Sequence, residues 1–267
     1  MFKSLLSHSR DDSKDMFQTV ASVTLDVEHL SYTPPPLSKM NSLREYLFLN
    51  GMGPQMLKDR LRMKLMSAED AELVDVSFRA SPGKFTAVIS HEAGERKTLM
   101  EIIAGRRRYG QVGGEVTMLE SNPLRSKLTL DTATAYVPRE AVSLYMPGLS
   151  YIEMITYAAR LRMLGSQSTS SIANIEKLIA VRVNEVLDMM NLLWCKDRII
   201  TERPTSRGSL GGELRKMAIA CEIVSYAPVL VFDDITADLD EQVENEVLGC
   251  LQVLALRGHT VVASFES

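Results

Sequence analysis

An apolar, strand-like run at residues 85–90 leads into an octapeptide, residues 91–98, whose residue types can bind phosphate. The octapeptide reads His-Glu-Ala-Gly-Glu-Arg-Lys-Thr, and an apolar helix is predicted after it, over residues 99–104. A strand, a turn and a helix in this order can cradle phosphate oxygens, because the backbone N–H groups at the helix N-terminus point at them. In this pattern Lys97 reaches the terminal phosphates of a nucleotide and Thr98 contacts a magnesium ion. The octapeptide is therefore a candidate phosphate-binding loop.

The candidate loop departs from the strict pattern at two of its glycine positions. Glycines are expected at the positions of His91, Gly94 and Arg96, because the loop needs left-handed backbone conformations and a close approach of the backbone to phosphate. Only Gly94 is a glycine, and Arg96 places a long side chain where the pattern has none. Taken alone, the octapeptide is interpreted equally well as an ordinary basic turn between a strand and a helix.

Two distant segments supply what a phosphate-binding loop needs. The apolar run 229–232 is followed by Asp233, which suits a magnesium ligand beside Thr98, and by Asp234, which suits a carboxylate that orients attacking water. Upstream, residues 209–213 place two glycines at the start of a predicted helix, a second surface for anions. Each segment alone also fits an ordinary strand end or glycine turn. Their order along the chain favours a nucleotide site.

Composition limits the class of protein. The 267 residues, 45% of them hydrophobic, are enough for one large α/β domain or two smaller ones. A formal net charge of -4 gives no basic field for nucleic acid. Three widely spaced cysteines match neither a disulfide framework nor a zinc site, which favours a reducing environment. No apolar run approaches the roughly 20 residues of a membrane-spanning helix, and no signal peptide is recognised.

Hydrophobic periodicity predicts the elements that must position these residues. Strands are expected at 23–27, on both sides of Ser81-Pro82-Gly83 between 73 and 90, in a hairpin around Gly113-Gly114, at 229–232 and at 260–264. Further helices are expected at 150–164, 172–193, 209–223 and 243–256. Residues 1–22 are polar and serine-rich, and they are interpreted as a flexible tail.

In order and spacing, these segments resemble the nucleotide-binding domain of an ATP-binding cassette (ABC) transporter, particularly the G or White subfamily of half-transporters. The segments that carry the resemblance, beyond the octapeptide, are 73–78, 104–106, 114–116, a Q-loop-like 136–140, 149–153, a signature-like 209–213, and a Walker B and D-loop-like 233–240. The resemblance implies an α/β fold of the P-loop NTPase class, with a mixed core sheet, an antiparallel β subdomain and a helical subdomain at about 145–225. The cassette would cover 23–267 and be incomplete at its C-terminal end, since the chain stops just after the switch position at Glu266.

The resemblance also implies ATP and Mg²⁺ as cofactors and assigns residues to them. Nucleotide contacts are implied for Tyr32, as the aromatic that stacks on adenine. They are also implied for the loop residues His91, Gly94, Glu95, Arg96, Lys97 and Thr98, and for the signature residues Ser209, Gly211, Gly212 and Glu213. Metal contacts are implied for Thr98 and Asp233, and catalytic positions for Asp234, Glu266 and Arg139.

Several of these positions carry unusual residues for the family. Arg139 replaces a glutamine that helps to coordinate magnesium; a guanidinium cannot bind a cation but can contact phosphate directly. Asp234 replaces the catalytic glutamate and is shorter by one methylene, and a misplacement of about 1 Å can cost on the order of a hundredfold in rate. Glu266 stands at the switch histidine and would repel the γ-phosphate, while Leu210 removes the signature hydroxyl. All four changes predict weakened hydrolysis.

The resemblance implies that two cassettes sandwich ATP. A second cassette, in a homodimer or heterodimer, and a transmembrane domain missing from this chain are the expected partners, with no nucleic acid. The chain itself is expected to be soluble and held at the cytoplasmic face of a membrane, where ATP would drive the export of lipid-like substrates.

The alternative is a catalytically inactive cassette that acts as a binding or regulatory partner of another half-transporter, so the enzymatic status stays open. A third possibility, a non-transport ABC ATPase, usually has two cassettes in one chain. Switch GTPases and small-molecule kinases do not account for Gly211-Gly212-Glu213.

Overall fold

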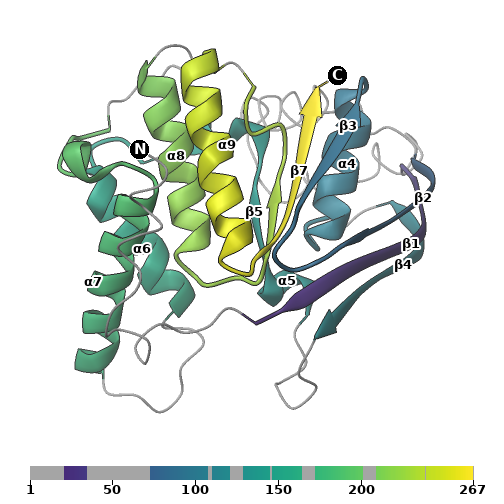
Figure 1. The fold of residues 1–267 in the computed structure, drawn as a ribbon, viewed down its shortest axis with the longest axis horizontal. Helices are drawn as coiled ribbons and strands as arrows, with labels where there is room; N and C mark the ends of the chain where they lie inside the picture. Colours follow the sequence, from purple (N-terminus) through teal and green to yellow (C-terminus); the bar gives the residue numbers. More distant parts are fainter. Residues whose placement is uncertain are drawn as a thin grey trace, which may run out of the picture.

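The structure is a computed structural model of the chain, and it describes residues 21–34, 73–107, 110–120, 129–144, 146–163, 172–200, 209–237 and 239–266. Within these ranges the chain forms a parallel sheet and an antiparallel sheet, with helices between and around them (Figure 1). The predicted tail lies outside the described residues, apart from Ala21 and Ser22. Among the helices that the structure describes, none combines the length and the apolar character needed to cross a bilayer.

Four strands form the parallel sheet, in the order β3-β7-β6-β5. Their bounds are Phe85–Ser90 (β3), Thr260–Glu266 (β7), Val229–Phe232 (β6) and Thr134–Val137 (β5). The central strands β6 and β7 are rich in β-branched residues and are buried on both faces, as helices on both sides of a parallel sheet require. Because all four strands run in the same direction, the residues that follow them meet along one edge of the sheet.

The antiparallel sheet has the order β2-β1-β4. Its strands are Val23–Thr33 (β1), Leu73–Ala80 (β2) and Gln111–Glu120 (β4). The predicted hairpin around Gly113-Gly114 is wrong, since both glycines lie inside β4. Gly114 has φ 78°, and a Cβ there would lie 2.3 Å from the carbonyl oxygen of His29, at a shift in the pairing of β1 with β4. The glycine therefore marks a β-bulge rather than a turn.

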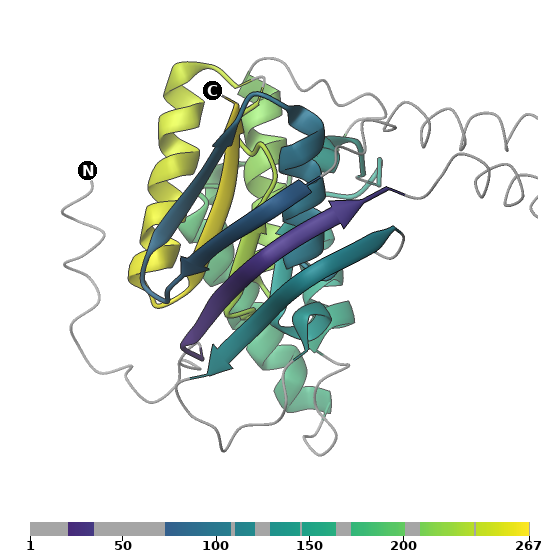
Figure 2. The same ribbon diagram turned by 90° about the vertical axis from the view of Figure 1, so that its right-hand side faces the viewer.

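Helices cover both faces of the parallel sheet. Their bounds are Ala93–Ile103 (α4), Leu130–Ala133 (α5), Tyr151–Met163 (α6), Ile172–Met189 (α7), Ser209–Ile223 (α8) and Glu241–Leu256 (α9), with short 3₁₀ turns at Arg139–Leu144 (η1) and Leu193–Cys195 (η3). Figures 1 and 2 show α4 between the two sheets, and α8 and α9 on the opposite face of the parallel sheet.

Alternate residues of β6 enter two separate hydrophobic cores. Val229 and Val231 pack with α4 and the antiparallel sheet, whereas Leu230 and Phe232 pack with the helices α6 to α9. This layering of antiparallel sheet, α4, parallel sheet and outer helices confirms the predicted fold class, with antiparallel and parallel pairing separated into two sheets. The helical subdomain and the limits of the cassette stay predictions.

Candidate functional site

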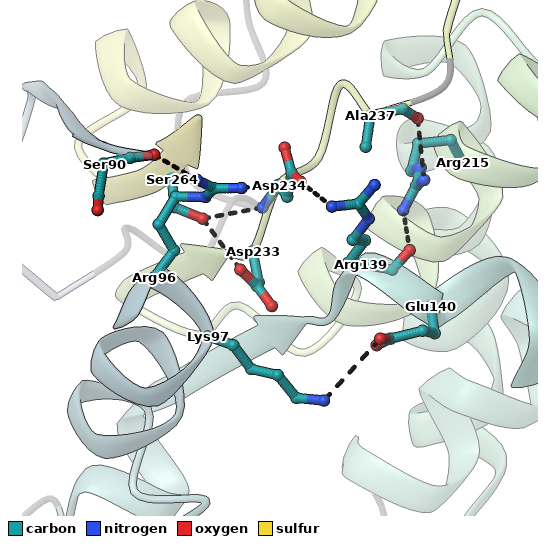
Figure 3. A network of polar contacts seen from close by, with 10 residues as sticks. All are labelled: Ser90, Arg96, Lys97, Arg139, Glu140, Arg215, Asp233, Asp234, Ala237 and Ser264. Carbon is teal, nitrogen blue, oxygen red and sulfur yellow. Dashed lines mark hydrogen bonds and ion pairs between the residues drawn. The ribbon is translucent and has the colours of Figure 1, made fainter. Parts of the chain in front are cut away.

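The carboxyl ends of the parallel strands bring together residues that are far apart in the sequence (Figure 3). Arg96 and Lys97 come from the start of α4, Arg139 begins η1 after β5, and Asp233 and Asp234 follow β6. Lys97 and the two aspartates therefore lie at the same edge of the parallel sheet. Glu266 ends β7 opposite Ser90 of β3, and its side chain is exposed.

The predicted phosphate-binding loop is helical. Helix α4 begins at Ala93, so only His91 and Glu92 separate it from β3. The backbone N–H of Arg96 donates to the carbonyl of Glu92 at 3.2 Å, the first helical hydrogen bond. None of residues 91–98 has a positive φ, so the expected left-handed loop conformation is wrong for this structure. The physical reason is the sequence, since non-glycine residues at two of three glycine positions favour the right-handed helix.

Side chains reinforce the early start of this helix. The Ser90 hydroxyl donates to Glu95 Oε2 at 2.9 Å, and the Ser90 carbonyl accepts a hydrogen bond from Arg96 Nη1. Gly94 is buried in the first turn. The Arg96 N–H is therefore already bonded and not free for a phosphate, while the earlier N–H groups of the turn have no intrahelical partner.

Two guanidinium groups converge on the carboxylate of Asp234. Arg139 Nη1 donates to Asp234 Oδ2 at 2.7 Å, and Arg96 Nη2 lies 3.6 Å from the same oxygen. The side chains of Arg96 and Asp234 are only 1% and 5% exposed, while that of Arg139 is 37% exposed. Figure 3 shows the two arginines approaching Asp234 from opposite sides. Buried charges need such partners, because desolvation of an unpaired ion is costly.

The backbone holds this cluster in place. Asp234 has φ 45°, and its N–H donates to Ser264 Oγ in β7 at 2.9 Å. Arg215 of α8 donates from Nη1 to the Arg139 carbonyl at 2.6 Å, and from Nη2 to the Ala237 carbonyl at 3.4 Å. Helix α8, β7 and the segment after β6 thus fix both ends of the Arg139–Asp234 pair. The pairing was not predicted from the sequence, although the two residues had been named separately.

Asp233 lies beside the cluster but has a different environment. The Ser264 hydroxyl donates to its Oδ1 at 3.0 Å, and burial raises the pKa of Asp233 to about 6. Lys97 Nζ lies 3.9 Å from Glu140 Oε1, and both side chains are partly exposed. Burial also raises the pKa of Tyr136 in β5, so this phenol stays neutral. Ser264 was missed because it is an ordinary residue of a strand. Tyr136 and Glu140 lie in the Q-loop-like segment 136–140, but only Arg139 of that segment was given a role.

Of the two aspartate carboxylates at the strand ends, Asp234 does not fit a magnesium ion. Magnesium takes carboxylate and hydroxyl oxygens, but Asp234 already accepts from Arg139, and the Arg96 charge lies next to it. Thr98 is 1% exposed on α4. In the described ranges there is no group of three or more His, Cys, Asp or Glu side chains with metal-binding geometry. The metal roles of Thr98 and Asp233 stay predictions.

Tyr32 lies in the core, away from solvent. Its side chain in β1 is 0% exposed, and the Arg107 guanidinium lies 4.7 Å from the ring centroid. Arg107 Nη2 also donates to the phenol oxygen at 3.0 Å. In this arrangement the ring offers no open face to an adenine. The stacking role stays a prediction, and it would require Arg107 to move.

The signature-like residues begin α8. The helix starts at Ser209, and the side chains of Ser209 and Leu210 are outside the described set. Glu213 accepts hydrogen bonds from Arg198 and from Tyr151 Oη, the latter at 3.3 Å. No hydrogen bond or ion pair of the described side chains joins Glu213 to Lys97 or Asp234. The nucleotide contacts predicted for Ser209, Gly211, Gly212 and Glu213 therefore stay predictions.

Gly212 allows α8 to approach α9 closely. A Cβ at this position would lie 2.4 Å from Cγ1 of Val243, which is held in the first turn of α9 by its N–H bond to Asp240 Oδ1. We expect Gly212→Ala to lower the free energy of unfolding by about 1–2 kcal/mol, because overpacking outweighs the better helix propensity of alanine. Urea unfolding measures this. In a Val243→Ala background, Gly212→Ala should cost much less stability than it does in the unchanged chain. A Gly212→Ala variant that is more stable than the unchanged chain would contradict the close contact.

Comparisons with known proteins identify relatives over most of the chain. The chain is 27% identical over 204 residues to the ABC transporter ATP-binding protein/permease wht-3 of Caenorhabditis elegans. The aligned region covers 76% of this chain and 31% of that protein. It is 29% identical over 241 residues to ABC transporter G family member 19 of Arabidopsis thaliana, covering 90% and 31% of the two chains. It is 30% identical over 189 residues to G family member 17 of the same plant, covering 71% and 27%.

The chain thus spans about a third of the length of these relatives. No family model matches it. A solved structure of an inward-facing, putative metal-chelate type ABC transporter has the same fold, with a TM-score of 0.56, 18% identity, and coverage of 92% of this chain and 73% of that one.

Proposed function

The chain is a nucleotide-binding domain of the G subfamily of ABC transporters, and we propose that it binds ATP at the carboxyl ends of β3, β5, β6 and β7 but hydrolyses it weakly or not at all. The supporting observation is the state of Asp234, whose carboxylate oxygen accepts from Arg139 at 2.7 Å and lies near the buried Arg96. A carboxylate that orients attacking water needs a free lone pair directed at that water. Here Oδ2, one of the two carboxylate oxygens, is hydrogen-bonded to Arg139 and ion-paired with Arg96.

ATP binding itself is supported by the charges around this cluster. Lys97 projects from the first turns of α4 and is about one third exposed, and Arg139 is also partly exposed. Both carry hydrogen-bond donors that suit phosphate oxygens. The buried guanidinium of Arg96 adds positive charge behind them.

We propose further that the domain works with a second cassette and with a transmembrane partner, at the cytoplasmic face of a membrane. The support is the likeness to a relative named as an ATP-binding protein and permease. Export of a lipid-like substrate follows from the subfamily resemblance alone, and no described residue bears on that substrate.

ATP binding to the chain tests this function. We expect saturable binding by calorimetry, and we expect Lys97→Ala to weaken it at least tenfold, because a charged donor to phosphate is lost. Lys84→Ala is the matched control, since Lys84 is exposed in the turn before β3, at the opposite end of that strand. It should bind ATP as the unchanged chain does. A folded chain that binds no ATP at millimolar concentration would contradict the proposal.

The alternative is a cassette without chemistry that regulates another half-transporter. The helical start of α4 favours it, because the Arg96 N–H, one of the backbone donors of the loop, is already bonded to the Glu92 carbonyl. Hydrolysis separates the two functions once ATP binding is known. A normal ATPase rate of the paired cassettes would exclude weakened hydrolysis, whereas binding of the partner without ATP would support the regulatory function.

A further inference from the structure

The cluster at the strand ends contains more positive charge than its central carboxylate can neutralise. Arg96 and Arg139 both face Asp234, so these three side chains together carry one net positive charge. Nearby, Lys97 is paired with Glu140 at 3.9 Å, Asp233 accepts from Ser264, and Glu266 is exposed at the end of β7. The positive charge next to Asp234 is therefore carried by the two arginines, while Asp233 and Glu266 add negative charge to the same edge of the sheet.

Arg139 is the member of this cluster that can reach a ligand. Its side chain is 37% exposed, and within the described residues it donates only through Nη1, to Asp234. A guanidinium has five N–H donors in a planar fork that matches phosphate oxygens. The remaining donors of Arg139 are thus available for bidentate contact with phosphate while the bond to Asp234 is kept.

Arg96 contributes charge from inside the protein. Its side chain is 1% exposed, Nη1 donates to the Ser90 carbonyl, and Nε has no partner among the described residues. Because Arg96 faces Asp234 and cannot reach solvent, it offsets the negative charge of that carboxylate. Arg139 consequently keeps most of its attraction for an anion.

We propose that this site binds the phosphate groups of a nucleoside triphosphate without a divalent cation, with Arg139 as the phosphate contact. The inference rests on the proposed function and specifies how the nucleotide is held. In a metal-dependent site a magnesium ion neutralises the phosphates and bridges them to carboxylates. Here two fixed guanidinium groups supply the positive charge, and they repel a second cation at the same place.

The test is ATP binding to the chain by calorimetry, in excess EDTA and in excess magnesium. We expect dissociation constants that agree within about twofold in the two conditions. Arg139→Gln keeps a similar shape and removes the charge, so it should weaken the metal-free binding about tenfold or more. Arg106→Gln, a loss of the same charge on an exposed residue beyond the far end of α4, should leave both constants unchanged.

Each outcome decides between the two proposals. Binding that requires magnesium would overturn the metal-free site and leave ATP binding intact. No binding in either condition, by a chain that unfolds cooperatively, would overturn ATP binding and the present inference with it. Equal binding by Arg139→Gln and the unchanged chain in EDTA would remove Arg139 as the contact, and the proposal would fail. A magnesium requirement gained by Arg139→Gln would support it.

Discussion

Replacing Asp234 with asparagine is expected to lower the free energy of unfolding by about 3 kcal/mol, because it leaves the guanidinium of Arg96 buried without a counter-ion. The side chain of Arg96 is 1% exposed, so water cannot replace the lost carboxylate. Asparagine keeps the size of the side chain and tolerates the φ of 45° at this position, so strain contributes little. Denaturant unfolding measures the change.

Asp75→Asn is a close control for this substitution. Asp75 also has a positive φ, 52°, and also pairs with a basic side chain, His29, but its own side chain is 68% exposed. We expect Asp75→Asn to change stability by less than about 1 kcal/mol, since exposed pairs contribute little.

A double variant separates charge from packing. Arg96→Met in the Asp234→Asn background removes the unpaired cation and should restore most of the stability, because an apolar side chain of similar length suits a buried site. A neutral or stabilising Asp234→Asn would contradict the account of a buried ion pair and would indicate a carboxylate retained for catalysis.

Acidification is expected to remove about 3 kcal/mol of stability through His259 as the pH falls from about 6.5 to about 4. His259 is 2% exposed, and its Nδ1 lies 2.8 Å from the Ala227 carbonyl, which assigns the proton to that nitrogen. Burial lowers the pKa of His259 from 6.5 to about 4; the hydrogen bond to the Ala227 carbonyl and Glu185 oppose this, whereas Arg182 and Arg257 add to it.

The sign follows from the direction of this shift. Because the folded pKa lies below the unfolded value, the neutral form is favoured in the fold, and the contribution is complete above pH 6.5. It is lost as the unfolded chain gains a proton that the folded chain excludes. Asp233, with a pKa of about 6, titrates in the same range with the opposite sign.

The measurement is therefore a comparison of unfolding free energies for the unchanged chain and His259→Gln across pH 4 to 7. The contribution of Asp233 is common to both and cancels. We expect the difference between the two curves to shrink on acidification by about 3 kcal/mol. A constant difference would mean that His259 is hydrated or protonated in the fold.

The sequence was sufficient for most elements of the core. Strands such as Val229–Phe232 and helices such as Tyr151–Met163 were predicted within a few residues, because their apolar periodicity matches the faces that they bury. The Gly113-Gly114 pair was misinterpreted because a glycine has the same signature in a hairpin turn and in a bulge. Only the carbonyl of His29, on another strand, distinguishes the two.

The residues at the strand ends were named from the sequence, but the contacts between them were not predicted. The order of motifs predicted Asp233 at the same edge of the sheet as the candidate loop, because residues that follow parallel strands meet there. The start of α4 at Ala93 could not be read from the motif, because the pattern that names the loop assumes glycines that this chain lacks. The direction of Arg96 depends on the phase of that helix, so its pairing with Asp234 was also out of reach.

The first turn of α4 also affects the rate at which a nucleotide binds, as distinct from its affinity. A ligand that is to be wrapped by backbone N–H groups must first open the bond from Arg96 N–H to the Glu92 carbonyl. Capture then becomes a two-step event, in which initial encounter is followed by local unwinding. Unwinding of a helical turn takes on the order of a microsecond, so this step delays capture only slightly, and we expect the domain to follow changes in ATP concentration.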